Sequence, residues 1–156
     1  MIWKKPHISK IYEALTAIAD SRIELDGPNK AKCFSSSKGK FYETEYDSAT
    51  NQIMSNDNTA YYTDSVSYPM IALLMLNGKI EYDQSLLETL KGIYWKDINQ
   101  KFKNNYDQAI EFVLTDLSNK GVDISSLKLK IDNIFSNVCN LELSFLGPKR
   151  LPPSGY

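Results

Sequence analysis

Apolar residues first recur at helical spacing between residues 8 and 23. They occupy positions three and four apart, which form one face of a helix, while charged residues fall on the opposite face. Pro6 lies just before this run, where proline is compatible with the start of a helix. An Asp-Gly-Pro-Asn turn sequence at 26–29 ends the run. The pattern therefore predicts one amphipathic helix within residues 1–25 that packs on a core.

The next segment, residues 30–64, has the pattern of β-strands. Short apolar or aromatic stretches alternate there with clusters of Ser, Asn, Asp and Gly that form turns. Because an isolated hairpin is only marginally stable in water, we expect this antiparallel meander of three or four strands to pack against helices. The predicted strands are 32–34, 40–46, 52–54 and 60–62.

Helical spacing returns after residue 65. The segment from Ser67 to Leu76 is apolar on all sides, which predicts a central, buried helix that ends at the following Asn-Gly pair. Further apolar stripes predict about four helices in residues 66–146. Residues 141–145 alternate between apolar and polar side chains and predict a short last strand, followed by an extended tail over 147–156. Later helices are expected to begin near Asp83, Trp95, Tyr106 and Asp123.

Together these elements predict an α+β fold in a single domain spanning residues 1–156: an N-terminal helix, a small antiparallel sheet and a C-terminal helical bundle. Hydrophobic residues make up 42% of the chain and charged residues 24%, as in an ordinary globular protein. The formal net charge is -1, so the protein has no strong overall electrostatic field that would attract nucleic acid or an anionic membrane.

The apolar runs also bear on localisation. The longest, residues 70–76, is far shorter than the ~20 residues that cross a bilayer. No apolar stretch of a secretory signal follows Met1. We therefore expect a soluble, cytoplasmic protein without membrane contact.

Few residue types are present that could support common catalytic or metal chemistry. His7 is the only histidine, and Cys33 and Cys139 lie far apart in the sequence, so a thiolate and imidazole metal cluster cannot be assembled. Two reduced cysteines are favoured over a disulfide in the cytoplasm. His7 is expected at the surface or at a helix start, because the sequence offers no orienting partner for a general base. Common nucleotide-binding and hydrolase motifs are absent. We therefore predict no catalytic residue, no metal ligand and no cofactor.

Three segments carry residues of acidic or phosphate chemistry. Residues 34–40 combine hydroxyls, a glycine and two lysines, as an anion-binding loop does, but a hairpin connection is the simpler interpretation. Glu43, Glu45 and Asp47 share one face of a predicted strand, and a solvated sheet face explains that alternation without chemistry. The Asn- and Asp-rich turn at 55–59 lacks the glycine that an EF-hand loop requires. An alternative function is thus a small metal- or phosphate-dependent enzyme that uses Glu43, Glu45, Asp57 or Asp64 with Lys38.

Residues 91–103 mix lysines with Trp95 and Phe102, a combination also found in nucleic-acid grooves. However, both aromatic residues fall on the apolar stripe of a helix, and lysines opposite such a stripe usually form a solvated face. The near-zero net charge also disfavours nucleic acid. Nucleic-acid binding through this segment is therefore only a second alternative.

Tyrosine is the unusual feature of the composition, with 10 among 156 residues. Tyrosine is enriched at protein interfaces because it buries much area at little entropic cost, although a nucleotide-composition bias explains the count equally well. We predict a soluble domain that binds another macromolecule, most simply a protein, as a regulator or inhibitor; a homo-oligomer is also compatible. Tyr61 and Tyr62 are adjacent in a predicted strand, so their side chains should point to opposite faces, and the exposed one should anchor the partner. The predicted contact residues are Tyr61, Tyr62, Tyr68, Tyr94, Lys96 and Lys103.

Overall fold

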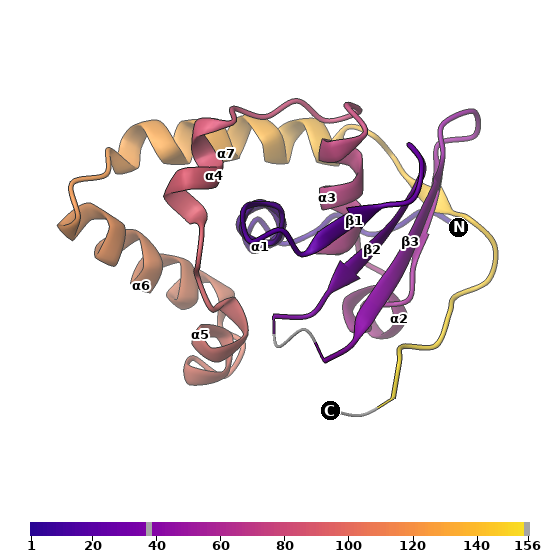
Figure 1. Cartoon of the computed structure of the whole chain (residues 1–156), viewed down its shortest axis with the longest axis horizontal. Helices are drawn as coiled ribbons and strands as arrows, with labels where there is room; N and C mark the ends of the chain where they lie inside the picture. Colours follow the sequence, from indigo (N-terminus) through magenta and orange to yellow (C-terminus); the bar gives the residue numbers. More distant parts are fainter. Residues whose placement is uncertain (37–38, 155–156) are drawn as a thin grey trace.

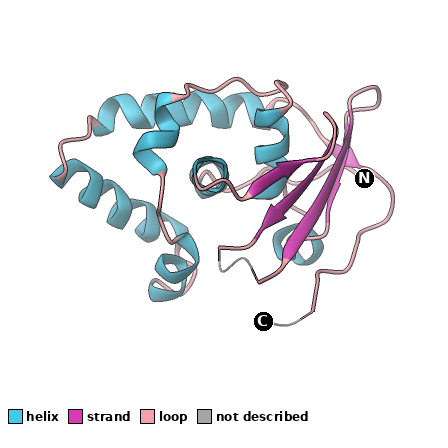
Figure 2. Ribbon diagram, in the orientation of Figure 1, coloured by secondary structure: helices cyan, strands magenta, loops and turns pink. Residues whose placement is uncertain are grey.

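The computed structural model describes residues 1–36 and 39–154. Its described part contains seven helices and five strands, which confirms the α+β fold class predicted from the sequence (Figure 2). In chain order they are α1 (Ser9–Ala19), β1 (Ile23–Leu25), β2 (Lys30–Phe34), β3 (Phe41–Asp47), β4 (Gln52–Ser55), α2 (Asn58–Thr63), α3 (Tyr68–Leu76), α4 (Ser85–Leu90), α5 (Trp95–Lys101), α6 (Tyr106–Asn119), α7 (Ile124–Cys139) and β5 (Ser144–Phe145).

The five strands form one sheet in the order β1-β2-β3-β4-β5. Neighbouring strands are antiparallel, except that β5 runs parallel to β4. Along β3 the side chains of Tyr42, Thr44 and Tyr46 are buried, while Glu43 is exposed. The alternation in the sequence therefore did indicate one packed and one solvated face, because successive side chains point to opposite sides of a strand. Figure 1 shows helix α1 end-on, between this sheet and helices α4 to α7.

Helix α3 is the centre of the hydrophobic core. Every residue from Pro69 to Met75 is buried, as the uniformly apolar sequence of this segment predicts. The neighbouring helix α1 packs against both α3 and α4. Thr16 of α1 donates a hydrogen bond to the carbonyl oxygen of Leu90 at 2.7 Å and accepts one from the indole Nε1 of Trp95 at 2.9 Å. A buried threonine thereby joins α1 to the end of α4 and the start of α5.

The predicted strand at 60–62 is wrong, because these residues belong to helix α2. Asp57 begins this helix, and its carboxylate accepts a hydrogen bond from the backbone N–H of Ala60 at 2.9 Å. This N-cap satisfies a backbone N–H group at the start of the helix. Its stabilising effect outweighs the preference of tyrosine for β-strands. The rings of Tyr61 and Tyr62 meet edge to face, 5.0 Å apart between their centres. The expected placement of these two side chains on opposite faces of a sheet therefore does not hold.

The predicted helix over residues 8–23 is too long at its C-terminal end. Helix α1 ends at Ala19, Ser21 adopts a left-handed backbone conformation with φ 57°, and Ile23 already pairs with Cys33 in the sheet. Ile23 continues the apolar spacing of the helix and is also a good strand residue, so periodicity alone could not separate the two elements. Strand β1 was missed for this reason.

Residues 147–154 carry no regular element and run from β5 beside the sheet towards α2 (Figure 1). The Lys149 ammonium group lies 2.8 Å from a carboxylate oxygen of Asp64 and also donates to the carbonyl oxygen of Tyr61. The guanidinium group of Arg150 lies 3.5 Å from the Glu45 carboxylate. Through Lys149 and Arg150 the tail thus contacts α2, the residue that ends it, and its own sheet.

Within residues 1–36 and 39–154, no helix combines the length and the apolar character needed to cross a bilayer.

Candidate functional site

A cleft of about 410 Å³ lies between α1, the β2–β3 end of the sheet, the start of α2 and the α5–α6 region. Figure 1 shows that these elements, which are far apart in the sequence, surround one region of the molecule. We call this site the polar cleft, because charged and amide side chains contribute most of its lining. Among its lining residues are Lys10, Glu13, Arg22, Lys96, Asn99 and Tyr106.

Helix α1 contributes a buried ion pair to the polar cleft. The ammonium group of Lys10 lies 3.1 Å from a carboxylate oxygen of Glu13, and only 9% and 12% of the two side chains are exposed. Burial raises the pKa of Glu13 above its ordinary value, and the nearby charge of Lys10 acts in the opposite direction. Such a buried pair contributes little to stability, because removing two charges from water offsets most of their attraction. Titratable groups of this kind in a cleft are typical of functional sites.

Arg22 forms the opposite wall of the cleft. Its guanidinium group donates a hydrogen bond to the carbonyl oxygen of Phe34 at 3.0 Å and lies 5.9 Å from the centre of the Tyr68 ring. Burial raises the pKa of the Tyr68 hydroxyl well above its ordinary value, and the nearby charge of Arg22 acts in the opposite direction. Burial raises the pKa of the Cys33 thiol to about 12, so the thiol stays protonated and is a poor nucleophile. These contacts hold the Arg22 side chain in place at the cleft.

The α5 wall contains a polar group without a partner. The Asn99 residue is only 8% exposed, and its side-chain oxygen Oδ1 has no hydrogen-bond partner among the described residues. A buried acceptor left without a donor costs about 1–3 kcal/mol, so folded proteins rarely retain one without a reason. Asn99 lines the polar cleft, but this oxygen atom is itself buried away from solvent.

Asp57 also lines the cleft, but its oxygen atoms have structural partners. One oxygen caps α2, and the other accepts a hydrogen bond from the Ser67 hydroxyl. This carboxylate therefore fixes the start of α2 relative to the start of α3. The interpretation of the 55–59 turn as a structural turn agrees with these contacts.

His7 lies at the start of α1, outside the cleft lining, as its position in the sequence suggested. Its Nδ1 accepts a hydrogen bond from the backbone N–H of Ser9, and its Nε2 lies 3.0 Å from Asp107. The sequence offered no orienting partner for His7, and the fold supplies one 100 residues away in α6. Both ring nitrogens are engaged in these contacts, which join the starts of α1 and α6.

Of the acidic residues considered for an enzyme site, Glu45 and Asp64 form ion pairs, Asp57 caps α2 and Glu43 is exposed. Glu45 lies 3.8 Å from Lys30 and also pairs with Arg150, while Asp64 pairs with Lys149. Lys38 lies outside the described residues, so the 34–40 segment is described only in part. Across residues 1–36 and 39–154, no three His, Cys, Asp or Glu side chains are arranged to hold a metal ion. Both cysteines are free, as expected for reduced thiols.

The residues predicted to contact a protein partner do not all gather in one place. Tyr68 and Lys96 line the polar cleft, whereas Tyr61 and Tyr62 lie on α2. Tyr62 is 72% exposed and Tyr94 is 68% exposed. Lys103 is an exposed residue of the turn after α5. The sequence did not single out the charged residues of α1, nor Arg22 and Asn99, as members of a site.

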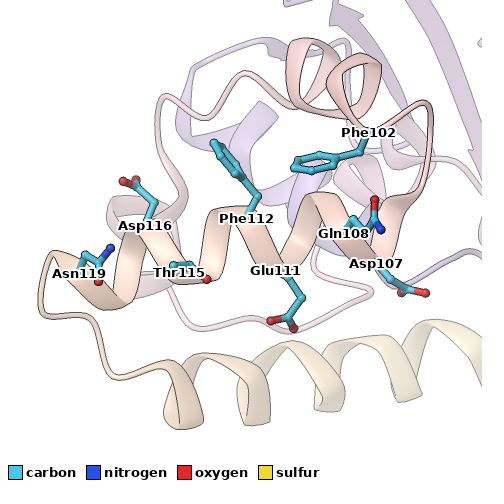
Figure 3. A pocket seen from close by; sticks show the side chains of 8 residues that line it. All are labelled: Phe102, Asp107, Gln108, Glu111, Phe112, Thr115, Asp116 and Asn119. Carbon is cyan, nitrogen blue, oxygen red and sulfur yellow. The ribbon is translucent and has the colours of Figure 1, made fainter.

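A second hollow, of about 600 Å³, follows α6 and includes Phe102 and Phe112. Figure 3 shows the two phenylalanine rings together on one side of the helix, while Asp107 and Glu111 point to the other side. The ammonium group of Lys101 already lies 4.1 Å from the centre of the Phe112 ring. Because its polar groups do not converge, this hollow is a weaker candidate than the polar cleft.

A family model described as Uncharacterised conserved protein UCP014422 matches residues 3–144. The chain belongs to this family. The match runs from before α1 to the start of β5, so every lining residue of the polar cleft lies inside it. No curated protein and no solved structure matches the chain.

Proposed function

We propose that the protein binds a small anionic molecule in the polar cleft. The observation that carries this proposal is the burial of charged side chains, above all Lys10, Glu13 and Arg22, in the walls of one cleft. Burying charged groups costs free energy, and a hydrophobic wall of the same volume would stabilise the fold at least as well. Their presence there supports a role in recognising a ligand.

The charges of the cleft favour an anion. Its described lining contains the cations Lys10, Arg22 and Lys96 and the carboxyl groups of Glu13 and Asp57. The Asp57 carboxylate is engaged by two hydrogen bonds, and the carboxyl group of Glu13 pairs with Lys10. Arginine presents several N–H donors in a planar fork that matches a phosphate or a carboxylate. The cleft therefore has an excess of positive charge and donors suited to such a group.

The dimensions of the cleft indicate a small molecule. Its volume of about 410 Å³ lies within the range of roughly 300–1,000 Å³ typical of ligand pockets. Aromatic side chains of Trp95 and Tyr106 contribute apolar surface to the walls. A site with these properties can enclose a metabolite but not a folded partner.

Calorimetric titration of the full chain with ribose 5-phosphate, compared with neutral ribose, tests the proposal. We expect the phosphate to bind and the neutral sugar not to bind. Arg22→Gln should weaken binding about tenfold or more, because a charge-assisted hydrogen bond is lost. Lys32→Gln is the matched control, because Lys32 is an exposed cation of β2 that lies over the ring of Phe41 rather than in the cleft.

Arg22 also contacts the backbone of Phe34, so Arg22→Gln can reduce stability as well as binding. Lys96→Gln provides a second variant, because Lys96 lines the cleft from α5 and is exposed. Equal binding of ribose and ribose 5-phosphate would contradict the proposal. So would a control variant that loses as much affinity as the two cleft variants.

As a second function we propose that exposed tyrosines contact a protein partner. The observation that favours it is the exposure of Tyr62 and Tyr94, since large exposed aromatic side chains are typical anchors at interfaces. With a partner recovered by pull-down, Tyr62→Ala or Tyr94→Ala should weaken its binding by about 2 kcal/mol with the fold intact. Tyr68→Ala is the contrasting variant, because Tyr68 packs against Arg22 and its loss should lower the melting temperature instead. Unchanged affinity in both surface variants would contradict this second function.

A further inference from the structure

An apolar surface lies between the α4–α5 segment and helix α6. Its main hollow has a volume of about 620 Å³ and adjoins the hollow of about 600 Å³ along α6, because Phe112 and Asp116 line both. Ile93 is the single described residue that lines both this main hollow and the polar cleft. We call the two adjoining hollows the apolar groove. Among its apolar lining residues are Tyr94, Ile98, Phe102, Phe112, Val113 and Val122.

Several of these apolar side chains remain in contact with water. Tyr94 is 68% exposed and Phe112 is 43% exposed, and the rings of Phe112 and Phe102 lie together on one side of α6 (Figure 3). Apolar surface leaves water favourably, so exposed apolar side chains that gather in a groove are typical of an interaction site. The polar groups of the groove do not converge on one point, which favours a macromolecular partner over a small polar ligand.

The rim of the apolar groove is acidic. Five carboxylates line it against two lysines, Lys91 and Lys120. The carboxylates are those of Glu88, Asp97, Asp107, Glu111 and Asp116. Lys120 is paired with Asp116 at 3.0 Å, and Lys101, which is outside the lining of both hollows, lies over the Phe112 ring. The carboxylates are in excess even with Lys101 counted, so the groove is complementary to a partner with basic residues.

The aromatic rings of the groove already attract a cation of the chain itself. The ammonium group of Lys101 lies 4.1 Å from the centre of the Phe112 ring and 5.5 Å from that of the Phe102 ring. Cations are held over aromatic rings by the electrons of the ring face. The ring of Tyr94 is more exposed than that of Phe112 and can take a cation of a partner in the same way.

We propose that the apolar groove binds an amphipathic helix of a protein partner, with apolar side chains against Tyr94 and Phe112 and basic side chains beside the acidic rim. The inference rests on the second proposed function, because Tyr94 belongs to the groove, and it names the chemistry of the partner. Helix α6 has 14 residues and so forms a wall roughly 21 Å long, enough for several turns of a second helix. Amphipathic helices commonly bind in grooves between helices through their apolar face.

Two labelled peptides of about 18 residues, long enough for an isolated helix, test the proposal by fluorescence anisotropy on the full chain. Both carry leucines at helical spacing; the other positions are lysines in one peptide and glutamates in the second. We expect the basic peptide to bind at least about tenfold more tightly than the acidic one. Equal binding of the two peptides, or binding of neither, would overturn the inference. The second proposed function is decided separately, by the effect of Tyr62→Ala and Tyr94→Ala on a recovered partner.

Apolar variants locate the bound peptide on the surface. Phe112→Ala and Tyr94→Ala should each weaken binding of the basic peptide about tenfold or more, because each removes an apolar contact of the groove. Leu129→Ala is the matched control, because Leu129 is 72% exposed on α7 and outside the groove lining. Circular dichroism checks that each variant folds. A control that loses as much affinity as the groove variants would overturn the inference.

A charge variant provides the second arm and leaves the apolar contacts in place. Asp97→Lys should weaken binding of the basic peptide and strengthen binding of the acidic one, whereas Glu81→Lys, at an exposed position outside the groove lining, should change both much less. Equal effects of the two substitutions would overturn the inference. Sedimentation tests the other occupant: a dimer of the chain that Phe112→Ala dissociates would overturn it as well, because a second copy would then cover the groove.

Discussion

Helix α3 and the walls of the polar cleft are both buried, but they are buried for different reasons. In α3 the buried side chains are apolar, and each stabilises the fold by about 1.5–3 kcal/mol when it leaves water. In the cleft walls, the buried side chains of Lys10, Glu13, Arg22 and Asn99 are polar or charged, and their removal from water costs free energy. Burial alone therefore does not indicate function in this protein, whereas burial of polar groups in a cleft supports the proposed binding site.

Thr16 and Asn99 sharpen the contrast, because both are buried polar residues. The hydroxyl of Thr16 has two partners, the carbonyl oxygen of Leu90 and the indole of Trp95, and it connects helices. The amide oxygen of Asn99 has no partner among the described residues and lines a cleft. A satisfied buried group stabilises the contacts between elements, whereas the unsatisfied oxygen of Asn99 carries a desolvation cost with no hydrogen bond to offset it.

The largest expected effect on stability is in the apolar core at α3. Leu73→Ala should lower the free energy of unfolding by about 2–5 kcal/mol, because Leu73 is fully buried in the centre of the core. Chemical denaturation followed by circular dichroism measures this change. The folded fraction should still bind ligand normally, since Leu73 is not part of the cleft lining. A denaturation curve that overlays that of the wild type would contradict this prediction.

Asn99→Leu should act in the opposite direction on stability. Replacing an unpartnered buried acceptor with an apolar side chain of similar size removes a desolvation cost, so the free energy of unfolding should rise by about 1 kcal/mol. The same denaturation experiment measures it in the absence of ligand. If the variant were clearly less stable than the wild type, Asn99 would be a structural residue like Thr16. The contrast drawn between these two buried polar residues would then be wrong.

A smaller effect on stability, which depends on pH, is expected for Glu13→Gln. Burial raises the pKa of this carboxyl group above its ordinary value of 4.5, so between 4.5 and its raised pKa the folded chain holds more protons than the unfolded chain. The wild type should therefore lose stability relative to Glu13→Gln as the pH rises above 4.5, since glutamine does not titrate. Thermal melts of both proteins across this range measure the difference. A difference that does not change with pH would show that the pKa of Glu13 is not raised.

The smallest effect is expected on the solvated face of the sheet. Glu43→Gln combined with Glu45→Gln should change the free energy of unfolding by less than about 0.5 kcal/mol, because exposed or half-exposed carboxylates contribute little. Calorimetry with Mg²⁺ and Ca²⁺ on the same pair of proteins provides a second measurement. A divalent-ion site present in the wild type and lost in the double variant would contradict the interpretation of this face as solvated surface.

Elements with a strong local pattern could be predicted from the sequence. Helices α3, α6 and α7 follow uninterrupted apolar stripes, and the side chains of Asn105 and Asp123 cap the last two. Strands β2, β3 and β4 are short segments of apolar or aromatic residues that lie between clusters of turn residues. Where two local signals compete, as between the aromatic residues 60–62 and the cap at Asp57, the sequence pattern led to the wrong element.

The site could not be predicted in the same way. Lys10 falls on the charged face of α1, which a sequence pattern assigns to solvent. In the structure this lysine lies 4.7 Å from the centre of the Tyr106 ring, because α6 begins beside it. Asn99 shares the buried face of α5 with Trp95, but nothing in the sequence of this helix indicates that the residue lines a cleft. The Tyr106 ring beside Lys10 belongs to a segment far away in the sequence, and no local pattern records such a contact.

The sequence by itself determined the fold class, the central apolar helix and the alternating faces of β3, because these depend on the spacing of apolar side chains along a few consecutive residues. Only the tertiary structure decided that part of the charged face of α1 is buried, that the Arg22 guanidinium meets Tyr68, and that the amide of Asn99 lines a cleft. The physical reason is that hydrogen bonding, burial and pKa depend on what surrounds a side chain in space. In this protein those surroundings are assembled from α1, the sheet and the α5–α6 region, and they exist only once the chain has folded.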